Sequence, residues 1–452
     1  MVWLLVISLA LVVCLSLEAA AHQRRLEKIS HRIAVTGIRG KSSITRLIAA
    51  GLSEAGYRVM AKTTGSKPVI IYPDGHEKEV KRRGKPTVLE QKNLVRLAAR
   101  EGADFLVAEM MSIQSEYLRA ESHKLLQPEV LVLSNIRVDH TEFLGKTKED
   151  VATNLCACLR PGVKVFMPEE EIRPEILEAA EKGRSEIKPV GPSLKVAELI
   201  SQLPYAEFES NLRLALAVLE HYEIPPDKIR SGIKNVCPDF GHLRAWPVGR
   251  ENGQQPGYFI NLFAANDPCS TEEALKQISD KIDFSRFMLA GLLSFRSDRA
   301  DRTAQWLDYL RRLEPDSESF LRRLDVLFLA GPGAVAVKRC LSRHPDWPTN
   351  RIALLKSREP DLCLQEIFRN LNMIDSGPKN KIEENINNPE PFTNSSRISS
   401  SSKNRPDLNP SERSKENPSA GKEAMIIGLG NIVGLGQKLI DYLERESHAF
   451  KL

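Results

Sequence analysis

A short glycine-containing loop between a strand and a helix constrains the fold of this chain more than any other feature. Residues 32–36 form a compact apolar strand pattern, and residues 41–55 form a helical pattern that stops at Gly56. The loop between them contains Gly37 and Gly40 and leads into Lys41. A glycine-containing turn that follows a strand and opens a helix is the context that a phosphate-binding loop requires. It predicts an α/β protein.

Strand and helix patterns alternate along most of the chain. Strand patterns lie at residues 57–61, 104–109, 130–135 and 163–167, and again at 258–262, 287–292, 326–330, 352–355 and 424–428. Helical patterns lie between most of them, which predicts mostly parallel sheets covered on both faces. Because the alternation restarts after Trp246-Pro247, we expect a P-loop ATP-binding domain over residues 30–244. A Rossmann-like α/β domain is expected over residues 245–452.

The first residues have a different composition. Residues 3–17 are apolar, alanines follow at 19–21, and basic residues come next at Arg24, Arg25 and Lys28. This pattern predicts a single-pass transmembrane anchor over residues 1–21 in the cell (inner or plasma) membrane, with the catalytic body in the cytoplasm. A cleaved signal peptide is the alternative, although no positive charge precedes the apolar run.

A second segment with unusual composition lies near the C-terminus. Residues 375–422 are rich in Ser, Asn, Pro, Lys and Glu and nearly free of large apolar side chains. Such a segment buries too little surface to offset the entropy of ordering, so we expect a disordered insert within the second domain.

Charge and cysteine usage exclude several classes of protein. The formal net charge of the 452 residues is +5, and basic residues are interleaved with acidic ones, so no nucleic-acid partner is expected. The seven cysteines are scattered and form no Cys-x-x-Cys pair, which indicates reduced thiols rather than a zinc site or a disulfide framework.

The loop at residues 36–43 has the groups that bind nucleotide phosphates. Gly37 and Gly40 allow backbone N–H groups to face an anion, and the helix N-terminus adds the positive end of its dipole. Lys41 supplies a charge for the β- and γ-phosphates, and Ser42 a hydroxyl for Mg²⁺. The strict GxxxxGK[ST] pattern is not met, because its first glycine falls on Val35. An ordinary turn with a surface lysine is the alternative.

The segment Thr36-Gly37-Ile38-Arg39-Gly40-Lys41-Ser42 resembles the ATP loop of the Mur ligases and of folylpolyglutamate synthases. Further segments resemble, in order, the ligase subunit of bacterial poly-γ-glutamate capsule synthases; they are residues 61–65, 90–92, 135–140, 263–267, 296–303 and 428–432. The resemblance runs from the apolar anchor to the C-terminus and skips only the insert. It implies a P-loop Mur-ligase-like domain followed by a Rossmann-like ligase domain.

The resemblance also implies a reaction, with ATP and Mg²⁺ as cofactors. ATP phosphorylates a carboxylate to an acyl phosphate, and an amine then attacks it to form an amide. In the capsule synthases both partners are glutamate, joined through the γ-carboxyl group. The expected partners are therefore glutamate, the growing poly-γ-glutamate chain and small membrane subunits of the synthase complex.

Site residues follow from the same resemblance. The catalytic set is Lys41, Glu109, His140 and Arg244, and the Mg²⁺ ligands are Ser42, Glu109 and His140. The ATP-binding set is Gly37, Arg39, Gly40, Lys41, Ser42, Ser43, Asn211 and Asn261. Glu109 also ends a strand, where an open α/β sheet places its site. Structural alternatives exist for several of them, including a helix cap for Asn211 and a solvated strand end for Glu109.

Two features keep alternatives open. The cluster Arg296, Asp298, Arg299, Asp301 and Arg302 is either a solvated helix face or a binding surface for a polyanionic glutamate chain. The function also has rivals: a folylpolyglutamate synthase or Mur-type ligase acting on another acceptor, or a membrane ATPase subunit of an export complex that makes no amide bond.

Overall fold

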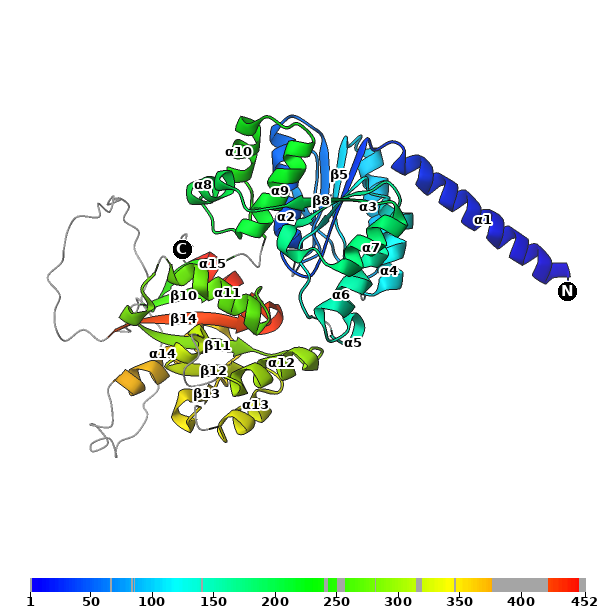
Figure 1. Ribbon diagram of the computed structural model, residues 1–452. Helices are drawn as coiled ribbons and strands as arrows, with labels where there is room; N and C mark the ends of the chain where they lie inside the picture. Colours follow the sequence, from blue (N-terminus) through cyan, green and yellow to red (C-terminus); the bar gives the residue numbers. More distant parts are fainter. Residues whose placement is uncertain are drawn as a thin grey trace, which may run out of the picture.

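The computed structural model describes residues 2–65, 67–82, 84, 86–139, 141–239, 243–249, 257–280, 282–313, 319–344, 347–375 and 422–446. Figure 1 shows two α/β lobes and a long N-terminal helix that projects away from the first lobe. Both sheets are mostly parallel, which confirms the predicted fold class.

The first lobe is built on an eight-stranded sheet in the order β4-β3-β2-β5-β1-β6-β7-β8. The strands are β1 (His31–Thr36), β2 (Val59–Lys62), β3 (Val69–Ile71), β4 (Glu77–Glu79), β5 (Phe105–Glu109), β6 (Val130–Leu133), β7 (Lys164–Pro168) and β8 (Glu186–Val190). Six strands are parallel, and β3 and β4 form an antiparallel extension at one edge. The central position of β1 places the loop that follows it at the middle of the sheet's carboxyl edge.

Helices cover both faces of this sheet (Figure 1). One face packs against α2 (Lys41–Glu54), α8 (Leu194–Gln202), α9 (Glu209–His221) and α10 (Pro226–Lys234). The other packs against α3 (Leu89–Arg100), α4 (Ser115–Ala120), η1 (Glu121–Leu126), α6 (Lys148–Leu155) and α7 (Pro174–Gly183), while α5 (Thr141–Leu144) lies at the edge. The strands are buried on both faces and are therefore rich in apolar residues.

The second lobe is built on a six-stranded sheet in the order β13-β12-β11-β14-β10-β9. The strands are β9 (Ala245–Val248), β10 (Gly257–Asn261), β11 (Phe287–Ser294), β12 (Val326–Ala330), β13 (Ile352–Leu354) and β14 (Glu423–Gly430). One face packs against α11 (Pro268–Ser279), α12 (Ala300–Arg311) and α13 (Ala334–Leu341), and the other against α14 (Pro360–Asp375) and α15 (Gln437–Glu446). Only β9 is antiparallel.

The chain returns to the centre of the second sheet late in the sequence. Strand β14 lies between β10 and β11 and pairs in parallel with both. It follows the insert predicted at residues 375–422, which lies outside the described residues except at its two ends. The two sheets fall on either side of residue 244, where the sequence pattern predicted a boundary.

The N-terminal helix α1 (Val2–Leu26) has two different parts. Its large apolar side chains from Val2 to Leu17 are exposed, and α1 is the one described helix that is long and apolar enough to cross a membrane. Its last turns instead join the first lobe: Glu18 pairs with Lys92, and the ring of His22 lies 3.0 Å from the carbonyl oxygen of Leu125. Leu26 is fully buried in the core.

These contacts predict different outcomes for two truncations. Removing residues 2–16 takes away only exposed side chains, so we expect a folded body with unchanged thermal stability. Removing residues 2–27 also takes Leu26 out of the core, a loss of about 2–5 kcal/mol. The Tm of the first lobe is expected to fall by roughly 5–15 °C, measured by thermal unfolding in the same detergent. Equal Tm values for the two truncations would contradict this account of α1.

Candidate active site

The loop between β1 and α2 adopts a conformation that depends on its glycines. Gly37 has φ 111° and Gly40 has φ 81°, which are left-handed values that other residues rarely adopt. Space is also lacking, because a Cβ on Gly37 would lie 2.3 Å from Oγ of Ser134. A Cβ on Gly40 would lie 2.1 Å from Oδ1 of Asn211. The loop thus packs directly against the first lobe.

A pair of substitutions separates the two requirements. Gly40→Ala is expected to weaken ATP binding at least about tenfold, since both the left-handed strain of about 1–2 kcal/mol and the overlap with Asn211 must be relieved. Gly75→Ala is the matched control, because Gly75 has φ 85° but no atom within 4 Å of the added Cβ. Titration of both variants with ATP checks the difference, and equal affinities would refute the packing role.

Lys41 and Ser42 begin α2 and face different partners. The ammonium group of Lys41 donates a hydrogen bond of 2.9 Å to the carbonyl oxygen of Gly37, and burial lowers its pKa while the charge of Glu109 opposes that change. The hydroxyl of Ser42 donates to Oε2 of Glu109 at 2.7 Å. The same oxygen accepts the N–H of Thr64 at 2.6 Å.

The Ser42–Glu109 pair fits a hard divalent cation. Mg²⁺ prefers oxygen ligands and is held by one or two carboxylates together with substrate phosphates and waters. Glu109 is only 3% exposed and ends β5 beside the phosphate loop. The described residues contain no group of three or more His, Cys, Asp or Glu side chains that could hold a metal ion. His140, the third ligand implied by the sequence, lies outside the described residues.

A buried polar network behind Glu109 was not predicted. Gln91 is fully buried and donates from Nε2 to the backbone oxygen of Glu109 at 2.9 Å and to the carboxylate of Glu121 at 2.5 Å. Glu121 in turn accepts the N–H groups of Met111 and Ser112. The end of β5 and the turn after it are therefore held from behind, which fixes the position of the Glu109 side chain.

Asn135 holds the phosphate loop from the neighbouring strand. Its Oδ1 accepts the N–H of Arg39 and its Nδ2 donates to the carbonyl oxygen of Arg39, both at 3.1 Å. The guanidinium of Arg39 points instead to Asp139 at 3.2 Å and Asp267 at 2.9 Å. Arg39 lines the pocket, but its charge is compensated by two carboxylates in this structure.

These carboxylates belong to an ion network between the two lobes. Arg39 and Asp139 come from the first lobe, whereas Asp267 and Arg302 come from the second. Arg302 is 1% exposed and hydrogen bonds to Asp139, with Asp267 at 3.8 Å. Arg299 lies 3.6 Å from Asp139. Of the two interpretations left open for the arginine cluster, a solvated helix face is therefore wrong for Arg302, which joins the lobes.

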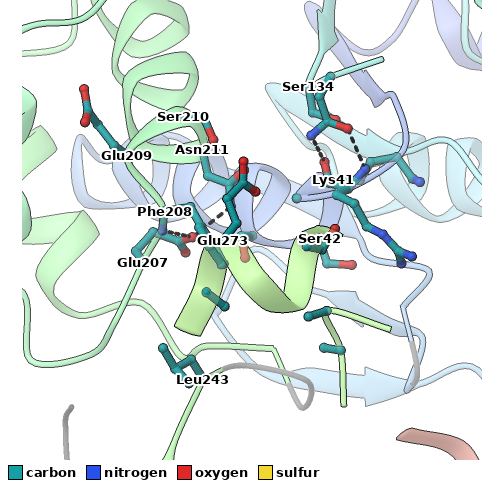
Figure 2. A pocket seen from close by; sticks show the side chains of 18 of the residues that line it. Lys41, Ser42, Ser134, Glu207, Phe208, Glu209, Ser210, Asn211, Leu243 and Glu273 are labelled. Atoms are coloured by element: carbon teal, nitrogen blue, oxygen red, sulfur yellow. Dashed lines mark hydrogen bonds between the residues drawn. The ribbon is translucent and has the colours of Figure 1, made fainter. Parts of the chain in front are cut away.

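A cavity of about 750 Å³ lies between the lobes and opens on the phosphate loop (Figure 2). The first lobe contributes the loop and the start of α9, and the second contributes the turn after β10 and one side of α11. Its lining includes Ile38, Arg39, Gly40, Lys41, Ser42, Ser43, Glu109, Asn135, Tyr205, Glu207, Phe208, Asn211, Leu243, Asn261, Leu262, Phe263, Ser270, Glu273, Ala274 and Ile278. Most of the predicted ATP-binding residues are thus brought together at one cavity.

Asn211 lies beside the loop and has a partner that the sequence did not reveal. Its Nδ2 donates to Oε1 of Glu207 at 2.8 Å, and the same oxygen accepts the N–H of Phe208 at 2.9 Å (Figure 2). Burial raises the pKa of the Glu207 carboxyl group. No pattern around Glu207 predicts this role, because the residue lies in an irregular segment before α9.

Two predicted residues are placed differently from the rest. Asn261 ends β10, is 1% exposed, and its Oδ1 accepts the N–H of Phe263 at 3.2 Å, so its amide shapes the turn at the cavity wall. Arg244 precedes β9 and pairs with Glu444 at 2.5 Å. Arg244 is absent from the described residues that line the cavity. Its contact with the phosphates stays a prediction that requires a movement of the second lobe.

Comparison with known proteins follows the same two lobes. The family model of the Mur ligase middle domain matches residues 35–215, and that of the poly-gamma-glutamate synthase CapB C-terminal domain matches residues 247–380. The PGA synthase CapB of Bacillus subtilis (strain 168) is 31% identical over 307 residues, which are 67% of this chain and 77% of that protein. The chain belongs to the CapB family.

A second CapB relative gives the same picture. The capsule biosynthesis protein CapB of Bacillus anthracis is 33% identical over 291 residues, which are 64% of this chain and 62% of that protein. Membership in the CapB family confirms the resemblance on which the predicted activity rests.

Solved structures agree on the fold. Escherichia coli FolC in complex with ADP superposes with a TM-score of 0.59 at 14% identity and covers 94% of this chain and 93% of that chain. MurF from Acinetobacter baumannii gives a TM-score of 0.55 at 14% identity, with 94% and 79% covered. The chain therefore has the Mur ligase and FolC fold, as predicted.

Proposed function

We propose that this protein is an ATP-dependent amide ligase that forms γ-glutamyl amide bonds during poly-γ-glutamate synthesis. The observation that carries the proposal is a phosphate loop whose Ser42–Glu109 pair faces an interlobe cavity, in a chain of the CapB family. The relatives are named as PGA synthase and capsule biosynthesis proteins, and the same activity is assigned here by this proposal.

The reaction joins two anions before it forms the amide. A γ-carboxylate oxygen attacks the γ-phosphorus of ATP, and the bond to the bridging oxygen breaks to release ADP. The resulting acyl phosphate is attacked at its carbonyl carbon by an amine, which loses a proton as inorganic phosphate leaves. Such phosphoryl transfer depends on cations and positioning more than on covalent help from the protein.

The side chains of this chain supply these needs. Lys41 neutralises the β- and γ-phosphates once it releases the carbonyl of Gly37, and the backbone N–H groups at the start of α2 add their dipoles. Asn135 holds the loop in shape. Mg²⁺ would be held by Ser42 and Glu109, with His140 as a further proposed ligand, and would supply charge neutralisation for the phosphates.

The helix α1 places this chemistry at a membrane. We assign its exposed apolar part as a single-pass anchor in the cell membrane, with the ATP-binding body on the cytoplasmic side. The acceptor would be the growing poly-γ-glutamate chain, and small membrane subunits of a capsule synthase complex would be the partners. Since the end of α1 packs into the first lobe, anchor and catalytic body move together.

Hydroxylamine provides the test, because it converts an acyl phosphate to a stable hydroxamate. Membranes containing the protein are incubated with ATP, Mg²⁺, glutamate and hydroxylamine, with Lys41→Ala as the inactive control. The proposal predicts glutamyl hydroxamate that requires ATP and is absent from the control. ATP hydrolysis that does not depend on glutamate, with no hydroxamate even after co-expression of membrane subunits, would instead favour an ATPase subunit.

A further inference from the structure

The carboxylate of Glu207 occupies an unusual position in the cavity. It lies beside the phosphate loop, yet its contacts are with hydrogen-bond donors of the protein and not with a cation. Oε1 accepts from Asn211 and from the N–H of Phe208, and the hydroxyl of Ser43 also hydrogen bonds to the carboxylate. A carboxylate can accept about four hydrogen bonds, so Glu207 retains acceptor capacity toward the cavity that it lines.

Glu207 also determines which groups of Asn211 face a ligand. The Nδ2 of Asn211 is used by Glu207, and its Oδ1 is packed against Gly40. Figure 2 shows the Glu207 and Asn211 side chains side by side at the start of α9. The donor of the Asn211 amide is therefore engaged, and Glu207 is the acidic acceptor that this end of the cavity presents.

The chemistry of ATP limits what such an acceptor can bind. The phosphates carry charge of the same sign and are served by the loop on the other side, at Lys41 and Ser42. The remaining donors are the 6-amino group of the base and the ribose hydroxyls. Around Glu207 the wall is formed by Tyr205, Phe208, Leu243 and Ile278, which suits the flat apolar face of a purine better than a ribose.

We infer that Glu207 is the residue that selects adenine, by accepting a hydrogen bond from the 6-amino group of the base. The inference rests on the proposed function only in that this cavity binds a nucleoside triphosphate. A hypoxanthine or guanine base carries a carbonyl oxygen at position 6, which would face a buried carboxylate and lose a hydrogen bond. A site built to pair with a donor rejects an analogue that lacks it strongly.

The test compares nucleotides that differ at one group. The dissociation constants of ATP, ITP and 2′-deoxy-ATP are measured with the full-length protein in detergent, for the wild type and for Glu207→Gln. The amide keeps an oxygen for Phe208 and Asn211 but can turn its NH₂ group toward a base carbonyl. We expect the wild type to bind ATP at least tenfold more tightly than ITP, and Glu207→Gln to reduce that ratio at least tenfold.

A control and two other outcomes complete the experiment. Glu220→Gln, at an exposed position of α9 whose carboxylate lies 3.7 Å from Lys195, should leave the ratio unchanged. Equal loss of ATP and ITP affinity in Glu207→Gln, or a change confined to 2′-deoxy-ATP, would overturn the inference and assign Glu207 to loop packing or to the ribose. Failure of the wild type to bind any of the three nucleotides would overturn the proposed function as well.

Discussion

Replacing Lys41 by methionine is expected to lower the rate of glutamate-dependent ATP turnover by about 10²–10³-fold. The ammonium group is the one cation of the loop that is free to turn to the phosphates, since Arg39 is held by Asp139 and Asp267. Methionine retains the length of the side chain, so the cavity keeps its shape and the loss reports the charge. The rate of phosphate release at saturating ATP and glutamate measures it.

The matched control is an exposed lysine on the same lobe. Lys182→Met, on α7, replaces a side chain that is 80% exposed and makes only a surface pair with Glu178, so its rate should stay within about a factor of two. If Lys41→Met retained a third or more of the wild-type rate, the loop would not be the site of phosphoryl transfer.

Replacing Arg302 by methionine is expected to cause the largest loss of stability. Arg302 is 1% exposed and stands between Asp139 and Asp267, so its removal leaves two nearly buried carboxylates to Arg39 alone. Breaking a buried ion pair from one side costs about 3–5 kcal/mol. Urea unfolding followed by tryptophan fluorescence reports the change, because Trp306 lies one turn further along α12 and is fully buried.

The same variant should also lose activity, because the network links the phosphate loop to the second lobe through Arg39. Arg296→Met is the control: its partner Asp298 is 60% exposed, and the pair is expected to contribute less than about 1 kcal/mol. A stability change for Arg302→Met no larger than that of Arg296→Met would mean that the interlobe network contributes nothing to holding the lobes together.

The features that sequence reasoning predicted are local in the chain. The phosphate loop combines a strand, two glycines, a lysine and a helix within a dozen residues, and Glu109 directly ends an apolar strand. Both therefore follow from short-range patterns. The strands that were missed lack the expected composition: β4 is fully exposed and charged, and β8 contains a proline at the sheet edge.

Contacts between distant segments were outside the reach of the sequence pattern. Arg39 was expected at the ATP phosphates, but its partner Asp267 lies 228 residues away in the other lobe. Glu207 has no neighbouring signal, and its role follows only from the packing of α9 against the loop. Arg244 was assigned from a motif, yet its side chain contacts Glu444, which lies 200 residues further along the chain. Tertiary packing, not local propensity, decides these positions.

The central claim is that the γ-phosphate of ATP is transferred to a glutamate carboxylate, and isotope transfer tests it most directly. Glutamate labelled with ¹⁸O in both carboxyl groups is supplied with ATP and Mg²⁺ to membranes that contain the protein, and the released phosphate is analysed by mass spectrometry. The account predicts one ¹⁸O atom in each phosphate released by the ligation, and none with Lys41→Met. Glutamate-dependent release of phosphate without the label would contradict an acyl-phosphate ligase.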